Sequence, residues 1–308
     1  MKEEAVQFGT PGSLVGIVTS PTLGDQRKPG VVLLNPGIVH RVGPGRIYVK
    51  IARALAAQGF SVLRFDFSGI GDSLVRLDNR PFEESSVDEA CAAMTFLQGT
   101  RGIKSFILVG GCSGAVASLE TTRVDSRSRA AILINFPARA DEAQTSYRHD
   151  RHYYWKHALL SLTSWRKLLT GQSNYQKISE ALTQGFKHKF IDGKIASGSD
   201  QRLRAMMREL VDQGVQLTFI CSKGDPLLKD LREAGGGDLR RLCADGKVAC
   251  DVIPSDHTFS SLYDQERLVD AILKRANIAA LSSEQQADAG GISSTRVEVV
   301  LQQGQSVR

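Results

Sequence analysis

Residues 106–117, FILVGGCSGAVA, are the most informative part of the sequence. Four apolar residues lead through small residues to one reactive side chain and then into a helix-forming run, which is the pattern of a nucleophile elbow. Because strand and helix come close together at such a turn, small residues are needed two positions before and after the nucleophile. Gly110 and Gly114 flank Cys112 in this way, so we predict Cys112 as the nucleophile.

A second register would make Ser113 the nucleophile, with Gly111 and Ala115 on either side. We favour Cys112 because the apolar strand ending at Val109 then runs directly into the first small residue. A structural turn without chemistry is a third interpretation, since glycine-rich strand ends are common in loops. A cysteine suits this place, because the first turn of a helix and a nearby histidine stabilise the attacking thiolate.

The composition indicates one α/β domain with an insertion. The chain has 308 residues, 42% of them hydrophobic, which is ordinary for a globular protein with a substantial core. We find no apolar run of about 18 residues that could cross a membrane and no signal-peptide pattern, so we expect a cytoplasmic protein. The five cysteines are odd in number and without a Cys-x-x-Cys pair, which argues against a disulfide framework or a zinc site.

The positive charge is concentrated in one segment. Residues 139–208 hold 13 Lys or Arg against 6 Asp or Glu, a net charge of +7 in a chain whose total is +6. Such a segment would attract an acidic or carrier-bound substrate, although a solvated helical surface explains it equally well. No nucleic-acid-binding motif is present, and we expect no nucleic-acid partner.

Apolar runs that read as strands alternate with segments of helical period, which indicates a doubly wound, mostly parallel sheet. Between the second and third strands, Ile47, Ile51 and Leu55 form a helical stripe that ends before Gly59, and such a crossover joins parallel neighbours. The predicted strands are residues 14–18, 31–34, 61–65, 106–109, 131–134, 215–220 and 248–253.

The alternation stops between residues 138 and 200, where leucines and aromatic residues follow a helical pattern. We predict a helical cap there, inserted into a core made of residues 1–137 and 201–280. From residue 281 to 308 the chain is rich in Ser, Gln, Gly and Ala, so we expect a polar C-terminal tail without ordered structure.

A nucleophile of this kind needs a base and an orienting acid. His257 follows the last predicted strand, where a loop would hold its ring beside the elbow. Asp225 follows the strand that ends at Ile220, and a loop there can reach the histidine loop. The alternative for Asp225-Pro226 is a simple turn.

The order nucleophile, acid, histidine is that of the α/β-hydrolase superfamily, which the chain resembles over residues 10–275. Residues 35–40, NPGIVH, occupy the place of its oxyanion loop, where a His-Gly pair is usual. The resemblance implies an oxyanion hole formed by the backbone amides of Ile38 and Ser113. Residues 66–73, DFSGIGDS, match the superfamily's Asp-x-x-Gly-x-Gly-x-Ser turn, which we interpret as loop architecture.

More narrowly, residues 35–46, 64–69 and 110–114 resemble the α/β hydrolases associated with bacterial exosortase and exopolysaccharide loci. The elbow alone also resembles cysteine-dependent dienelactone hydrolases and certain thioesterases. We therefore expect hydrolysis or acyl transfer on a small-molecule ester or thioester through Cys112, with no cofactor or metal. The alternatives are a serine esterase that uses Ser113 and a non-catalytic binding protein with a hydrolase fold.

Overall fold

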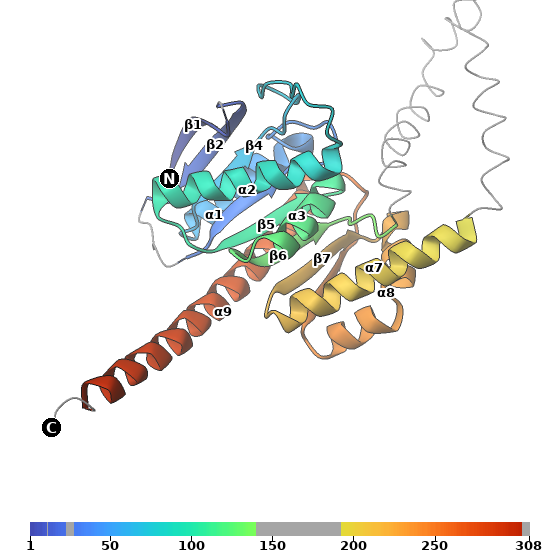
Figure 1. Cartoon of the computed structure of the whole chain (residues 1–308). Coiled ribbons are helices and arrows are strands. Elements are labelled where there is room, and N and C mark those ends of the chain that lie inside the picture. The colour runs from blue at the N-terminus through green and yellow to red at the C-terminus, as the bar shows by residue number, and fades with distance from the viewer. Residues whose placement is uncertain (11, 23–27, 140–191, 304–308) are drawn as a thin grey trace, which may run out of the picture.

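The computed structural model describes residues 1–10, 12–22, 28–139 and 192–303. They contain an eight-stranded sheet with the order β1-β2-β4-β3-β5-β6-β7-β8, in which β1, β2 and β4 pair antiparallel and all other neighbours pair parallel (Figure 1). The strands are β1 (Lys2–Phe8), β2 (Leu14–Ser20), β3 (Gly30–Leu34), β4 (Val62–Phe65), β5 (Phe106–Gly111), β6 (Ser128–Ile134), β7 (Gln216–Ser222) and β8 (Val248–Ile253).

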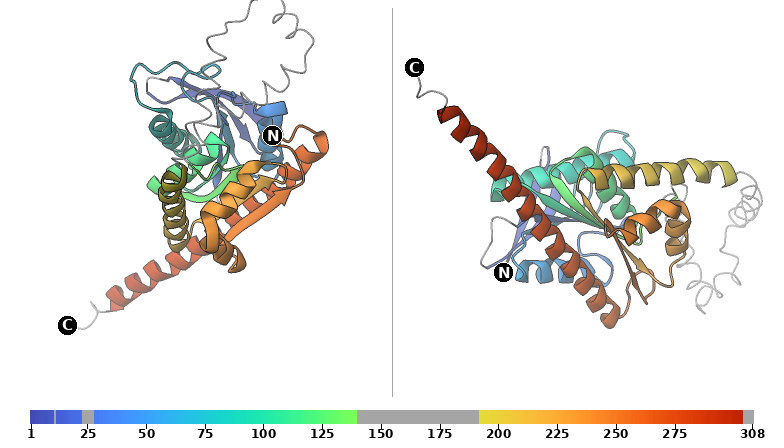
Figure 2. Two further views of the ribbon diagram at one scale, coloured as in Figure 1. Left: turned by 90° about the vertical axis from the view of Figure 1, so that its right-hand side faces the viewer. Right: turned by 90° about the horizontal axis from the view of Figure 1, so that it is seen from below.

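Helices cover both faces of the sheet, which confirms the doubly wound architecture. Helices α1 and α9 pack on one face, while α2, α3, α7 and α8 pack on the other (Figures 1 and 2). A short 3-10 helix (Pro44–Arg46) precedes α1. The helices are α1 (Ile47–Ala57), α2 (Phe82–Arg101), α3 (Ser113–Val124), α7 (Asp192–Asp212), α8 (Pro226–Ala244) and α9 (Leu262–Gln303).

The central strands β3 and β5 are continuously apolar because they are buried on both faces. In β5, Ile107 and Val109 join the core cluster under α1 and α9, whereas Phe106 and Leu108 join the cluster under α2. Burying one such side chain stabilises the fold by about 1.5–3 kcal/mol. The seven predicted strands are all present, and the predicted crossover through α1 joins the parallel pair β3 and β4.

The first strand was not predicted. β1 begins with the charged residues Lys2, Glu3 and Glu4 and is mostly exposed, so it lacks the apolar run that marked the other strands. It pairs antiparallel with β2 at the edge of the sheet. There Glu3 pairs with Arg53 and Arg64. An edge strand needs few apolar residues, which is why composition alone missed it.

The structure describes only part of the predicted cap and most of the predicted tail. Residues 140–191, most of the predicted cap of residues 138–200, lie outside them. Residues 192–200 form the first part of α7, and α7 packs beside α8 on the sheet. The prediction of a tail without ordered structure was wrong as far as Gln303, because α9 continues to that residue (Figure 1). The segment contains no proline and several Ala, Gln and Glu residues, which favour helix.

Candidate active site

The chain turns sharply at Cys112, between the end of β5 at Gly111 and the start of α3 at Ser113. Cys112 has φ 49° and ψ −117°, a backbone conformation that is uncommon for a residue with a side chain. Its N–H donates a hydrogen bond to the carbonyl oxygen of Ile134 in β6, at 3.0 Å, which anchors the turn to the sheet. A strained residue at such a strand-to-helix turn exposes its side chain above the sheet.

Close backbone contacts explain the glycines around Cys112. A Cβ atom on Gly110 would lie 2.1 Å from the carbonyl oxygen of Gly114, and one on Gly114 would lie 2.3 Å from that of Leu34. Gly111 is less confined, since a Cβ atom there would be 3.4 Å from its nearest neighbour. The positions that exclude side chains are therefore those that flank Cys112, as the first of the two sequence registers requires.

Three predicted side chains lie in one hydrogen-bonded row at the carboxyl ends of β5, β7 and β8. The Sγ atom of Cys112 is 3.0 Å from Nε2 of His257. On the other side of the ring, Nδ1 of His257 hydrogen-bonds Oδ2 of Asp225. The second oxygen, Oδ1, accepts the N–H of Leu227 at 2.9 Å and so caps the start of α8. The carboxylate is thus fixed by a helix while it contacts the ring.

The charged form of His257 is favoured in this row. Burial by itself would lower the pKa of His257, but hydrogen bonds to Asp225 and Cys112 outweigh burial and raise the pKa to about 11. The ring therefore carries a proton at neutral pH. An imidazolium between a carboxylate and a sulfur stabilises negative charge on that sulfur, which is the reactive form of a cysteine.

The alternative nucleophile, Ser113, makes a different contact. Its Oγ accepts a hydrogen bond from the N–H of Gly37 at 2.7 Å, which holds the loop after β3 against the elbow. Among the side chains described, Cys112 rather than Ser113 is within hydrogen-bond distance of Nε2 of His257. In this geometry the serine hydroxyl positions a loop.

The two predicted oxyanion amides, Ile38 and Ser113, border the same cavity as Cys112. Within the described parts of the chain, neither N–H donates a hydrogen bond to a protein acceptor. Asn35 begins the loop that carries Ile38, at the position where the α/β-hydrolase superfamily usually has histidine. Its side chain is buried and donates to the carbonyl oxygen of Phe65 at 2.7 Å, which ties the end of β3 to the end of β4.

No protein-family model matches the sequence, and a search of curated proteins found no match. Solved structures do match. An esterase from Pyrococcus furiosus is 14% identical over 90% of this chain and 92% of its own, with a TM-score of 0.59. A proline iminopeptidase from Mycobacterium smegmatis is 17% identical over 92% of this chain and 100% of its own, with a TM-score of 0.54. This chain has the α/β-hydrolase fold.

A third similar structure, an α/β serine hydrolase homologue from Coxiella burnetii, is 15% identical over 89% of this chain and 96% of its own, with a TM-score of 0.50. At such identities the likeness concerns the fold. The narrower resemblance to hydrolases of exosortase and exopolysaccharide loci stays a prediction.

The Asp66 turn of this hydrolase fold is loop architecture, as predicted. The Asp66 carboxylate is buried and accepts the backbone N–H groups of Arg41 at 2.5 Å and Asp72 at 3.0 Å. It also pairs with the Arg41 guanidinium. A Cβ atom on Gly71 would lie 2.2 Å from the carboxylate, so glycine is required there. The turn fixes the loop after β3, which carries the Ile38 amide.

Sequence reasoning missed Asn135, which joins the loops that carry the acid and the histidine. Asn135 follows β6, is buried and has a left-handed φ of 46°. Its Nδ2 donates to the carbonyl oxygen of His257 at 2.9 Å, and its Oδ1 accepts from the N–H and the hydroxyl of Ser222. The available signal was an asparagine directly after an apolar strand, since asparagine tolerates this conformation.

Tyr48 was also missed, because it looked like an ordinary core residue of α1. Its buried hydroxyl donates to the carbonyl oxygen of Leu34 at 2.8 Å and accepts the N–H of Gly111 at 3.1 Å. Burial raises the pKa of Tyr48, so the hydroxyl keeps its proton. It therefore braces the ends of β3 and β5 immediately beneath Cys112.

A cavity of about 1720 Å³ opens above the row. Cys112 and His257 border it together with mainly apolar side chains from the loops and from α3 and α7. These include Ile38, Val39, Ile70, Phe82, Val116, Leu119, Phe136, Leu203 and Met206. Charged residues also border it, among them Glu120, which pairs with Arg202 at 2.6 Å. Such a lining suits a mainly apolar ligand.

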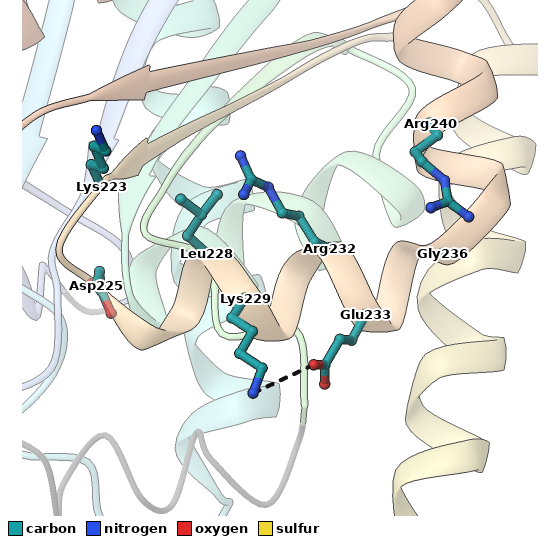
Figure 3. A pocket seen from close by; sticks show the side chains of 8 residues that line it. All are labelled: Lys223, Asp225, Leu228, Lys229, Arg232, Glu233, Gly236 and Arg240. Atoms are coloured by element: carbon teal, nitrogen blue, oxygen red, sulfur yellow. Dashed lines mark ion pairs between the residues drawn. The ribbon is translucent and has the colours of Figure 1, made fainter.

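A second cavity, of about 560 Å³, lies along α8 beside Asp225 (Figure 3). Four basic side chains border it, while Asp225 and Glu233 are its acidic ones. Lys229 pairs with Glu233 at 3.7 Å. The basic residues are Lys223, Lys229, Arg232 and Arg240, all outside the basic segment noted in the sequence, most of which is not described.

The described residues contain neither a membrane-spanning helix nor a cluster of side chains suited to a metal site. Within them, no helix has the length and apolar character needed to cross a membrane. Nor do they contain a group of three or more His, Cys, Asp or Glu side chains arranged to hold a metal ion.

Proposed function

We propose that the protein cleaves esters or thioesters through a covalent acyl-enzyme on Cys112, and passes the acyl group to water or to another acceptor. The observation that carries the proposal is the 3.0 Å contact between Sγ of Cys112 and Nε2 of His257, whose other nitrogen bonds a buried aspartate. A nucleophile, a base and an orienting carboxylate in one row form the arrangement that acyl transfer requires.

In the first half of the reaction, the Cys112 thiolate attacks the carbonyl carbon and the carbonyl oxygen becomes an oxyanion. Ile38 and Ser113 line the same cavity, and their N–H groups would stabilise that charge. The His257 imidazolium gives its proton to the departing alcohol or thiol. The acyl group is then held on the Cys112 sulfur.

In the second half, neutral His257 accepts a proton from water, an alcohol or an amine that attacks the acyl-enzyme. Collapse of the second oxyanion expels the Cys112 thiolate and restores the starting row. Asp225 holds Nδ1 throughout and stabilises the imidazolium each time it forms.

Two features support esters and thioesters over amides. A thiolate nucleophile is a better leaving group than the amine it would have to expel, so amide attack reverses easily. The apolar lining of the larger cavity fits the acyl part of such a substrate. The similar structures carry the names of an esterase, a peptidase and a serine hydrolase homologue, which agree with chemistry at an acyl carbon.

The test is intact-protein mass spectrometry after exposure to a panel of acyl thioesters and aryl esters, followed by peptide mapping. We expect an acyl adduct on Cys112 that Cys112→Ala abolishes and Ser113→Ala retains. Labelling by a fluorophosphonate that is lost in Ser113→Ala would instead identify a serine esterase. Absence of any adduct, together with slow iodoacetamide labelling of Cys112, would support a non-catalytic binding protein.

A further inference from the structure

Two cysteines outside the active site lie against each other where α8 meets β8. The Sγ atoms of Cys243, near the end of α8, and Cys250, within β8, are 2.8 Å apart. Both are free thiols. Because a disulfide bond is about 2.05 Å long, the two sulfurs would have to approach by less than about 1 Å to form one.

The fold brings this pair together through the alternation of β8. Val248 is buried in the core cluster that contains Leu239 and Leu242 of α8. Side chains two positions apart on a strand point to the same face, so Cys250 faces α8 as Val248 does. Cys243 also packs against that cluster, from the helix side.

The turn between helix and strand is fixed by hydrogen bonds. The N–H of Gly246 donates to the carbonyl oxygen of Cys243 at 3.2 Å, and that of Lys247 donates to Leu242 at 2.9 Å. Gly246 has a φ of 68°, the left-handed conformation that ends many helices. The approach of the two sulfurs is therefore part of an ordered helix end.

Both cysteines are at least partly accessible to solvent. Cys250 is exposed and Cys243 is partly exposed, whereas Cys221, on the neighbouring strand, is buried. Partial burial and the adjacent Cys243 thiol raise the pKa of Cys250. Either thiol of the pair can make the first attack on an oxidant that reaches it from solvent.

We propose that Cys243 and Cys250 form a dithiol site that small-molecule disulfides, such as oxidised glutathione, convert to an intrachain disulfide. The thiolate of one of these cysteines attacks one sulfur of the oxidant, which forms a mixed disulfide and releases one thiol. The other cysteine then loses its proton, and its sulfur attacks that of the first cysteine and displaces the second thiol. The protein gives up two electrons and two protons, and the oxidant takes them up as two thiols.

The new bond would join β8 to the last part of α8. That part lies beyond a kink at Gly236, where φ is 54° and ψ is −135°, whereas Asp225 caps the other end of the helix. We therefore expect iodoacetamide to label Cys112 at the same rate in the reduced and the oxidised protein. This inference is independent of the reaction proposed for Cys112.

The experiment exposes the full chain to mixtures of oxidised and reduced glutathione, traps free thiols with an alkylating agent and digests the product with trypsin. Cleavage after Arg241 and Lys247 separates the two cysteines into peptides 242–247 and 248–267. In the folded protein we expect these two peptides joined, with two hydrogens fewer than their sum. Cys243→Ser and Cys250→Ser should each abolish the joined product, and Cys91→Ser should retain it.

A parallel sample in denaturant tests whether the fold matters. The joined peptides should then require a more oxidising mixture, because the helix end no longer holds the sulfurs together. The proposal is overturned if the folded protein carries separate glutathione groups or two alkylated cysteines where the joined product was expected. Equal formation in folded and denatured chains would also overturn it.

Discussion

Backbone strain in this protein is concentrated around the candidate site. Among the described residues other than glycine, four have a positive φ: Arg46, Cys112, Asn135 and Phe259. Cys112 is the proposed nucleophile, Asn135 holds the carbonyl of His257, and Phe259 follows that histidine by two positions. Such conformations cost about 1–3 kcal/mol each and persist only where the surroundings impose them. Three of the four lie at the candidate site, so the strained backbone there serves to orient its side chains.

Replacing Gly114 by alanine tests the close approach at the elbow. The added Cβ atom would lie 2.3 Å from the carbonyl oxygen of Leu34, which is backbone and has little freedom to move. We expect a loss of about 1–3 kcal/mol in the free energy of unfolding, together with slower alkylation of Cys112. Urea unfolding measures the first and iodoacetamide labelling the second.

Gly99 provides the matched control. It is an exposed glycine in α2, and a Cβ atom there meets nothing within 4 Å. Gly99→Ala should stabilise the protein by about 0.5–1 kcal/mol, because alanine favours helix. If Gly114→Ala had the same effect on stability as Gly99→Ala, the inference that the elbow is too crowded for a side chain at residue 114 would be wrong.

The Asp225–His257 contact predicts a defined pH dependence of stability. Since the pKa of His257 rises from 6.5 to about 11 on folding, the contact stabilises the fold fully below pH 6.5 and loses its effect as pH approaches 11. The ring side chain is 38% exposed, so solvent screening reduces the effect. Asp225→Asn should cost about 1–2 kcal/mol at pH 6 and clearly less at pH 10.

Urea unfolding of both proteins at pH 6 and pH 10 measures this difference. The comparison with wild type at each pH removes the contribution of other groups that titrate in the same range. A cost of Asp225→Asn that grew toward pH 10 would contradict the raised pKa of His257.

At the scale of elements, the site depends on loops that follow adjacent parallel strands. β5, β6, β7 and β8 lie side by side, and Cys112, Asn135, Asp225 and His257 each follow one of them. Carboxyl ends of parallel strands meet at one edge of the sheet, which is why residues 145 positions apart in the chain can touch. Asn135 links two of these loops by hydrogen bonds.

Asn135→Gly tests whether that link positions the histidine. Glycine keeps the left-handed conformation but removes the hydrogen bonds to His257 and Ser222. We expect iodoacetamide labelling of Cys112 to slow, because the imidazolium of His257 is held less firmly beside the sulfur. Asn135→Asp, which keeps the acceptor for Ser222, should fall between glycine and wild type. Unchanged labelling in Asn135→Gly would assign the residue a purely structural role.

At the scale of the whole molecule, α9 closes one face of the sheet with only part of its length. Leu268, Ile272 and Ala276 belong to the core cluster with α1, and Ala279 and Ala280 are its last α9 members among the side chains that the structure describes, which end at Ser282. Beyond them the helix extends away from the sheet (Figure 2). The fold therefore depends on the first half of the helix.

Truncation after Ser282 should leave the fold and the labelling of Cys112 intact, because Ser282 itself keeps its hydrogen bond to Gln216. By contrast, Ile272→Ala removes a fully buried side chain and should cost about 2–5 kcal/mol. Thermal unfolding of both variants compares them. A large fall in the melting temperature of the truncated chain would show that the distal half of α9 packs on the core.

Much of the fold could be read from local chemistry. The sequence predicts seven of the eight strands, and the signal is clearest for central strands such as β3 and β5, because burial on both faces requires a continuous apolar run. β1 left no such mark, since an edge strand pairs through its backbone and keeps charged side chains in water. The course of α9 was missed for a similar reason, because a polar composition suits both helix and tail.

Hydrophobic period and the glycines of a tight turn are local properties, so the sequence predicts seven of the eight strands, their crossover and the candidate residues Cys112, Asp225 and His257. The sequence favours Cys112 over Ser113, but the contact of Cys112 with His257 is visible only in the folded chain. Cys112 and Ser113 both have small neighbours in the sequence, but only the packing of Gly110 against Gly114, and of Gly114 against Leu34, makes one register crowded. The roles of Tyr48 and Asn135 are also visible only in the tertiary structure, because hydrogen bonds between distant strand ends leave no periodic signal in the sequence.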